Sequence, residues 1–129
     1  MLDNIANLHA QCFPHRPWSA DEFADLKKSG CDIIASQNGF IVWRVVGDDA
    51  EIITIGVAPN ARRGGIATAM LTLAESDARA HNATRMILDV AADNAAARKL
   101  YETLGYSIDG RRPKYYDGVD AILMSKNLN

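Results

Sequence analysis

The chain has 129 residues, of which 48% are hydrophobic and 23% charged, and its formal net charge is −2. This composition fits one globular domain over residues 1–129, and the near-neutral charge excludes a general attraction to nucleic acid or to an anionic membrane. No apolar run approaches the roughly 20 residues that span a bilayer, and no signal peptide is visible. Two cysteines make no disulfide scaffold, so we expect a cytoplasmic protein.

The first quarter of the chain predicts two helices separated by a turn. Apolar residues recur at helical spacing through residues 2–12. Prolines break any helix across residues 13–18. Ser19, followed three residues later by Glu22, matches a capping box and starts a second helix that ends near Lys28.

Three strands are predicted next. Residues 32–37 and 40–46 flank Asn38-Gly39, which is a strong hairpin signal. A second turn at residues 47–49 leads into a third strand over Glu51–Val57. These elements predict an antiparallel start to the sheet.

The second half of the chain predicts two more helices and three more strands. In chain order they are helix 65–81, strand 85–90, a helix from Asp93 or Asn94 to Gly105, strand 106–109 and strand 121–126. We expect a polar loop at 110–120 between the last two strands. The order α-α-β-β-β-α-β-α-β-β predicts an α/β fold with a mixed sheet, helices on both faces and one right-handed parallel crossover.

A glycine-rich turn between the third strand and the third helix is the most informative feature. It comprises Arg62, Arg63, Gly64, Gly65, Ile66, Ala67 and Thr68. Free N–H groups and the helix dipole favour an anion at a helix start, glycines allow close approach, and the arginines add charge. We therefore predict a diphosphate site. The Walker A and Rossmann patterns are missing, and an ordinary strand–turn–helix joint is the structural alternative.

Two segments together resemble the GNAT acetyltransferase superfamily. In the first, Arg62, Gly65 and Ala67 fill its acetyl-CoA signature: Arg or Gln, two residues, Gly, one residue, then Gly or Ala. The second is residues 93–106, which contain the Asn…Leu-Tyr…Gly-Tyr block. Three further pieces make the ribosomal-protein-alanine N-acetyltransferase branch the most similar one: Pro17-Trp18-Ser19 with Phe23, Arg111-Arg112 followed by Tyr115-Tyr116, and residues 120–124.

The resemblance implies a GNAT-like fold that transfers acetyl directly from acetyl-CoA to an amine, without a metal. The residues that it assigns to the co-substrate are Ile55, Gly56, Val57, the seven residues 62–68, Asn94, Ala97 and Tyr101. The N–H of Val57 would polarise the thioester carbonyl where the third and fourth strands part. Gly56 fits a bulge there, or else a crowded position. Asn94 has a second interpretation as a helix N-cap.

The resemblance also assigns the proton transfers. Tyr101 matches the general acid, although its spacing with Ala97 and Leu104 alone favours a core position. Asp89 is the candidate base, with a solvated strand-end aspartate as the alternative, and Glu51 is the second candidate base, acting through water. A zinc site of His9, Cys12 and His15 lacks a fourth ligand, so we expect no metal.

The acceptor is predicted both from amine pKa values and from the family resemblance. An α-amine titrates near 7.7–8.0 and a lysine near 10.4, so an aspartate acting through water suits a protein N-terminus better. By resemblance, Trp18, Arg112, Tyr115 and Tyr116 border the acceptor groove, with a solvated basic loop as the alternative. A small-molecule amine acetyltransferase and a catalytically silent acetyl-CoA-binding module remain open, as do monomer and homodimer.

Three departures from the family pattern bear on these expectations. Asp89 stands where the branch usually has glutamate, and the acidic pair before the last strand is reduced to Val119-Asp120. The family's first strand is missing ahead of the first helix. Either the fold tolerates this loss or the start is placed too late.

Overall fold

The computed structural model describes residues 2–14, 17–116 and 118–129, and for Leu2 and Tyr116 it describes the backbone alone. In chain order the elements are α1 Leu2–Cys12, α2 Ala20–Lys28, β1 Asp32–Ala35, β2 Gly39–Val46, β3 Asp49–Val57, a 3₁₀ turn Pro59–Ala61, α3 Ile66–Ala80, β4 Arg85–Ala91, α4 Ala95–Thr103, β5 Ser107–Tyr116 and β6 Val119–Asn127. The predicted order of helices and strands is confirmed. Within the described ranges, no helix is long and apolar enough to cross a membrane.

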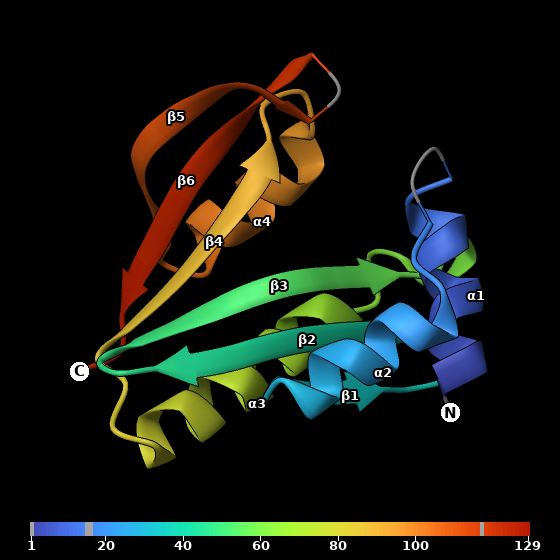
Figure 1. Cartoon of the computed structure of the whole chain (residues 1–129). Coiled ribbons are helices and arrows are strands. Elements are labelled where there is room, and N and C mark those ends of the chain that lie inside the picture. The colour runs from blue at the N-terminus through green and yellow to red at the C-terminus, as the bar shows by residue number, and fades with distance from the viewer. Residues whose placement is uncertain (1, 15–16, 117) are drawn as a thin grey trace.

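A fork divides the six-stranded sheet, whose order is β1-β2-β3-β4-β6-β5. The middle pair, β3 and β4, is parallel, and its pairing joins residues 49–51 to 85–87 and goes no further. Figure 1 shows β3 and β4 leaving a common point near the C-terminus and diverging, β3 with β1 and β2 below, β4 with β5 and β6 above. The predicted parting of these two strands is confirmed.

Two apolar cores lie on opposite faces of the sheet. The larger core joins the inward faces of α3 and α4 to β2, β3, β4 and β6. Its members include Trp43, Leu71, Met86, Tyr101 and Met124. The smaller core joins α1 and α2 to the other face of β2, through Ile5, Leu8, Phe23, Phe40 and Val42. Helices therefore cover both faces, as predicted for a mixed sheet.

Local sequence signals set several element ends. The Ser19 side chain accepts from the N–H of Glu22, whose carboxylate accepts from the N–H of Ser19, so the predicted capping box is present. Asn94 is the cap of α4, and its side-chain oxygen accepts from the N–H of Ala97 at 3.2 Å. Both caps satisfy N–H groups that a helix start leaves without partners.

The prediction of a polar loop at residues 110–120 is wrong. β5 continues to Tyr116, and β6 starts at Val119, so the two strands form a long hairpin. Residues 111–115 are all exposed, so this edge strand shows no alternation of apolar and polar side chains. Alternation was the signal on which the strand prediction relied, and an edge strand with solvent on both faces does not produce it.

Candidate active site

Backbone groups of β3 face the fork. The N–H of Ala58 donates to the carbonyl of Asn38 at 2.7 Å, and Gly39 pairs with Val57. This pattern makes Gly39 and Val57 a pair without mutual hydrogen bonds, so the N–H and carbonyl of Val57 point away from β2. Because hydrogen-bonded and non-hydrogen-bonded pairs alternate along the strands, the N–H and carbonyl of Ile55 also point away from β2. Since β4 has already separated, these N–H groups point into the space between the strands.

Gly56 is required by crowding and does not form a bulge. A Cβ atom built there would lie 2.7 Å from the Phe40 ring and 2.8 Å from Cys12 Sγ. The bulge lies further back, where the pairing shifts between Val42 and Trp43 and leaves Ile53 as the extra residue of β3. The bulge prediction for Gly56 is thus wrong, and the crowded alternative fits. The close approach holds β3 against α1 in the part of β3 that no longer pairs with β4.

The glycine-rich turn adopts left-handed backbone at two of its residues. Gly65 is the N-cap of α3 with a φ of 84°, and Arg63 has a φ of 68°. Gly65 offers no side-chain cap, so no described side chain hydrogen-bonds to the first-turn N–H groups of the helix, which opens with Ile66, Ala67 and Thr68. A non-glycine residue at positive φ is uncommon and clusters at functional sites. The geometry therefore suits an anion at this helix start.

Arg62 connects this turn to β3. Its Nε donates to the carbonyl of Val57 at 3.0 Å, and Cys12 Sγ lies 3.3 Å from the same oxygen as a second donor. The two donors fix the end of β3 relative to α1 and the turn. No bond from the terminal nitrogens of Arg62 to another described residue is seen, so these nitrogens are available to an anion. The sequence did not indicate this link, because nothing in the motif shows which carbonyl the arginine reaches.

Tyr101 lies in the larger core, 6% exposed, and burial raises the pKa of its phenol to about 12. Its ring meets the ring of Tyr106 edge-on with centroids 5.9 Å apart. Among the described residues, no hydrogen-bond partner is seen for the Tyr101 hydroxyl. The core position expected from spacing is therefore present, and it keeps a protonated phenol available across the neutral and mildly alkaline range.

Asp89 and Glu51 lie together on the face of the sheet opposite Tyr101. Asp89 alternates with Leu88 and Val90, which pack in the core with Tyr101, so its carboxylate points to the other face. Glu51 pairs with Ile87, two residues before Asp89, at the last paired position before the fork opens. Glu51 also forms a 3.1 Å ion pair with Arg44 of β2.

The surroundings of Asp89 act on its acidity in opposite directions. Burial raises the pKa of Asp89 most, Arg112 lowers it, and Glu51 raises it. The net result is a half-buried carboxyl with a pKa above its ordinary value. Abstraction of a proton near neutral pH works best with a base whose pKa is higher than that of a free aspartate, and the pKa of Asp89 is shifted in this direction.

The β5–β6 hairpin brings Arg112 to the same face as Asp89. Arg112 pairs with Ala121, which pairs with Ala91 of β4. Its guanidinium lies 4.7 Å from the centroid of the exposed Tyr115 ring. The predicted acceptor residue Tyr116 belongs to β5 by its backbone, but its side chain lies outside the described atoms. The neighbouring Arg111 is instead bound by Asp120.

Trp18 is held by a buried histidine that the sequence did not single out for this role. The ring of Trp18 stacks on His9 with centroids 4.7 Å apart, and the N–H of Trp18 donates to His9 Nδ1 at 3.1 Å. His9 is 2% exposed, and burial lowers its pKa to about 4, against the charge of Glu22, which raises that pKa. His9 is therefore neutral at pH 7, and its Nδ1 holds the backbone of Trp18 in place by accepting the Trp18 N–H.

The start of α4 places Ala97 one turn and Asn94 about two turns before Tyr101. The capping bond uses the Asn94 carbonyl oxygen and leaves its amide N–H groups for other partners. Arg98, in the first turn of the same helix, is a partly buried arginine to which the sequence analysis assigned no role. One terminal nitrogen of its guanidinium donates to the carbonyl of Ala92 at 3.1 Å, but its Nε is buried without a partner among the described residues.

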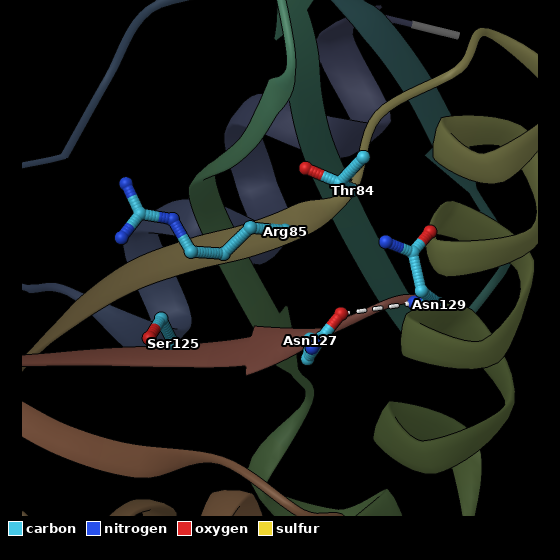
Figure 2. A pocket seen from close by; sticks show the side chains of 5 residues that line it. All are labelled: Thr84, Arg85, Ser125, Asn127 and Asn129. Atoms are coloured by element: carbon cyan, nitrogen blue, oxygen red, sulfur yellow. Dashed lines mark hydrogen bonds between the residues drawn. The ribbon is translucent and has the colours of Figure 1, made fainter.

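Two surface hollows lie away from most of these residues. One, of about 280 Å³, is lined by Thr84, Arg85, Ser125, Asn127 and Asn129 at the closed end of the fork (Figure 2). The other, of about 410 Å³, follows α2 and contains Trp18 alone of the predicted residues. Over residues 2–14, 17–116 and 118–129, no three His, Cys, Asp or Glu side chains gather as metal ligands. His15, considered above with His9 and Cys12, lies outside those residues.

The chain is similar to acetyltransferases in sequence and structure. The acetyltransferase (GNAT) family model matches residues 2–106. The ribosomal protein bS18-alanine N-acetyltransferase of Escherichia coli K12 is 35% identical over 118 residues, which cover 84% of this chain and 80% of that protein. The crystal structure of the Escherichia coli enzyme superposes with a TM-score of 0.87 at 28% identity, covering 99% of this chain and 88% of the other.

Two further structures widen the comparison. Nourseothricin acetyltransferase matches with a TM-score of 0.68 at 30% identity over 71% of this chain and 58% of its own. An acetyltransferase from Elizabethkingia anophelis, solved with acetyl-CoA bound, shares the fold with a TM-score of 0.76 at 16% identity, covering 94% of this chain and 88% of its own. The match of the family model over residues 2–106 and the 35% identity to the bS18-alanine N-acetyltransferase show that the chain belongs to the GNAT acetyltransferase family and is an N-acetyltransferase.

Proposed function

We propose that this protein transfers the acetyl group of acetyl-CoA to the N-terminal α-amine of a protein, as its bS18-alanine N-acetyltransferase relative is named for doing. The observation that carries the proposal is the fork. Its two faces present different groups, a buried phenol on one side and two carboxylates on the other. An amine can thus lose its proton on one face while a thiolate receives a proton from the other.

The co-substrate fits the donor side of the fork, by which we mean residues 55–57 and 62–68. Acetyl-CoA supplies an activated acetyl group, a thiol leaving group and a diphosphate. The open first turn of α3, with Gly65 in the left-handed region and Arg63 beside it, suits the diphosphate. The N–H groups of Ile55 and Val57 that face the fork suit the extended arm and the thioester carbonyl.

Proton transfer is assigned to residues on the two faces. Tyr101 donates to the departing sulfur, and its high pKa means that it is protonated whenever the reaction runs. Asp89, directly or through water, takes the proton of the amine, with Glu51 as the second carboxylate. Glu51 is less suited because Arg44 already holds its charge.

The acceptor assignment rests on the cost of neutralising an amine. At pH 7 the neutral form costs about 1 kcal/mol for an α-amine and nearly 5 kcal/mol for lysine. A single half-buried aspartate suits the first substrate. We assign the approach of the protein N-terminus to the acceptor side, defined as Trp18, Glu51, Asp89, Arg112 and Tyr115.

We place the reaction in the cytoplasm, where a ribosomal-protein acceptor is made. Cys12 and Cys31 are both free thiols, which agrees with a reducing compartment.

The test is a panel of acceptors assayed for release of the CoA thiol. It contains peptides that begin with alanine, the same peptides with a blocked N-terminus and an internal lysine, and small polyamines and aminoglycosides. We expect thiol release with free-N-terminus peptides and a mass increase of one acetyl group at their first residue. Acetylation of lysine peptides alone would contradict the α-amine assignment.

A small-molecule amine is the second candidate acceptor, and the similarity to nourseothricin acetyltransferase favours it. The same panel separates the two, because a small amine would then be acetylated with a kcat/KM above that of every peptide. A silent acetyl-CoA-binding module predicts a third result, thermal stabilisation by acetyl-CoA with no thiol release from any acceptor.

A further inference from the structure

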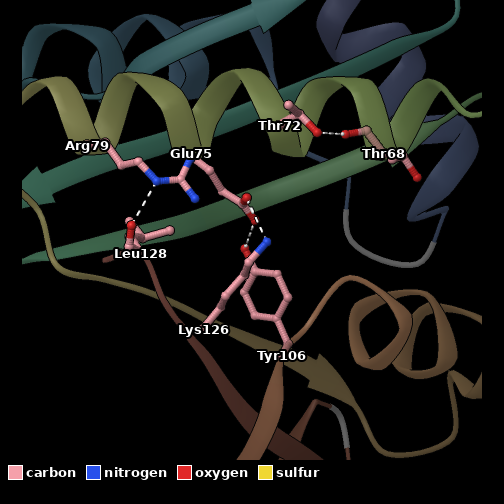
Figure 3. A network of polar contacts seen from close by, with 7 residues as sticks. All are labelled: Thr68, Thr72, Glu75, Arg79, Tyr106, Lys126 and Leu128. Carbon is pink, nitrogen blue, oxygen red and sulfur yellow. Dashed lines mark hydrogen bonds and ion pairs between the residues drawn. The ribbon is translucent and has the colours of Figure 1, made fainter.

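A buried polar network joins α3 to the opposite arm of the fork (Figure 3). The Glu75 carboxylate, 6% exposed, accepts from the Tyr106 hydroxyl at 2.9 Å and from Lys126 Nζ at 2.9 Å, one bond to each oxygen. Lys126 Nζ also lies 5.8 Å from the centre of the Tyr106 ring. The three side chains therefore form a closed triangle of one anion, one cation and one phenol. We call it the Glu75 triangle.

The Glu75 triangle connects the two arms of the fork. Glu75 belongs to α3, which packs under β2 and β3, whereas Tyr106 precedes β5 and Lys126 lies in β6. Backbone pairing between the two arms stops after three residue pairs at the closed end of the fork. Lys126 pairs with Met86, which pairs with Ala50, so the triangle lies at that closed end. It ties the arms together where the sheet itself joins them weakly.

Tyr106 passes this restraint to Tyr101. The N–H of Tyr106 donates to the carbonyl of Tyr101 at 2.9 Å, and the two rings meet edge-on. No hydrogen bond to a described residue restrains the Tyr101 hydroxyl. The orientation of that phenol therefore depends on what its ring packs against, and the Tyr106 ring is itself fixed by its hydroxyl bond to Glu75.

We propose that Glu75, Tyr106 and Lys126 are positioning residues for acetyl transfer: through the Tyr106 ring they hold the Tyr101 hydroxyl at a fixed distance from the donor side of the fork. The inference rests on the proposed function, in which Tyr101 is the acid. A bond to a buried charged group is worth more than a neutral one, and removing one partner leaves the carboxylate short of a donor. The triangle is therefore a stiff link, and small changes in it should move Tyr101.

The decisive experiment is a double-mutant cycle between Tyr106→Phe and Tyr101→Phe, assayed with acetyl-CoA and an alanine-initiated peptide. Tyr106→Phe removes one hydroxyl and retains the ring. We expect it to lower kcat about tenfold, while the dissociation constant of acetyl-CoA changes by less than twofold. In the Tyr101→Phe background the same substitution should change kcat by less than twofold, because the group that it positions is gone.

Two further variants keep the test sharp. Glu75→Gln retains the shape of the side chain but loses its charge, and it should reproduce the loss in kcat. Trp43→Phe is the matched control, because the Trp43 indole N–H donates to Asp77 of the same helix at 2.9 Å yet joins α3 to β2 within one arm. It should lower the melting temperature at least as much as Tyr106→Phe and leave kcat within twofold of the wild type.

The outcomes separate the two proposals. A full tenfold effect of Tyr106→Phe in the Tyr101→Phe background, or an equal loss of kcat in Trp43→Phe, would overturn the positioning role while leaving the function intact. Unchanged kcat in Tyr101→Phe itself would refute the acid assignment and the positioning role with it. Absence of thiol release by the wild-type protein with every acceptor would refute the proposed function.

Discussion

The donor side and the acceptor side of the fork are built in different ways. The donor side comes from one continuous stretch of chain, in which Ile55 to Val57 are followed within a few residues by the glycine-rich turn. The proposed acceptor side takes its residues from four separate regions of the chain, namely Trp18, Glu51, Asp89, and Arg112 with Tyr115. The contrast teaches that, under the proposed function, backbone groups of one segment would recognise the diphosphate and the thioester, whereas side chains from separate elements would recognise the acceptor.

The largest expected effect concerns the face opposite the acceptor. Replacement of Tyr101 by Phe removes one oxygen from a buried ring and should lower kcat about 100-fold, within the usual range for loss of a general acid. The dissociation constant of acetyl-CoA, measured by calorimetry, should stay within twofold. Because the pKa of Tyr101 is raised to about 12, wild-type kcat should show no alkaline fall assigned to this group below pH 10. Such a fall, if abolished by the substitution, would contradict the raised pKa of Tyr101, whereas an unchanged kcat in Tyr101→Phe would contradict its assignment as the acid.

An acid titration should affect the acceptor side through His9. Its pKa is about 4 in the fold and 6.5 when unfolded, so the neutral form is favoured by folding. The stability that depends on neutral His9 is complete above pH 6.5 and is lost as the pH falls towards 4. Between pH 7 and pH 5 the loss should be about 2 kcal/mol in the free energy of unfolding. His9→Gln, measured by denaturant titration, should reduce this loss.

The control for that titration is His81→Gln. His81 is exposed, and its pKa is raised by a backbone hydrogen bond and the charge of Asp77. It therefore acts in the opposite direction and should not reduce the acid loss. Equal acid sensitivity of His9→Gln and the wild type would show that the imidazole is not the source.

The donor side can be tested by itself with two neighbouring glycines. Gly65→Ala puts a Cβ on a residue with a φ of 84°. This left-handed conformation costs a residue with a Cβ about 1–2 kcal/mol more than it costs glycine. Acetyl-CoA should bind about tenfold more weakly, since the turn must either strain or reorient its N–H groups. Gly64→Ala is the matched control, because a Cβ there meets only the Ala61 carbonyl at an ordinary 3.6 Å. Equal affinities of the two variants in calorimetry would rule out a role for the left-handed turn.

The smallest expected effect would refine the acceptor side. Arg112→Gln removes the cation that lowers the pKa of Asp89, so that pKa should rise. If Asp89 is the base, the acid limb of the kcat/KM profile moves upward by a fraction of a pH unit, with a few-fold loss of activity at pH 6. Lys114→Gln on the same hairpin is the control and should leave the limb in place. An unmoved limb in Arg112→Gln would point to Glu51 instead.

Much of the strand, turn and helix around the glycine-rich turn could be predicted, because the signals for these elements are local. A strand, two glycines, two arginines and an apolar helical repeat lie within about 30 residues, and the left-handed backbone at Gly65 follows from the residue type. The prediction failed at Gly56, where the reason for glycine is the approach of Phe40 and Cys12 from other elements. It also failed at residues 110–120, where an exposed edge hairpin shows no alternation of apolar and polar side chains.

The sequence by itself determined the order of elements, the two helix caps, the position of the glycine-rich turn and the family, because each depends on residues near one another along the chain. Only the tertiary structure decided that Val57 N–H faces an open fork, that Asp89 and Glu51 share one face while Tyr101 lies on the other, and that Glu75 reaches Tyr106 and Lys126. These depend on where β4 leaves β3. That point depends on contacts between residues far apart in the chain, including those of the helices on both faces of the sheet, and no local stretch of residues encodes such contacts.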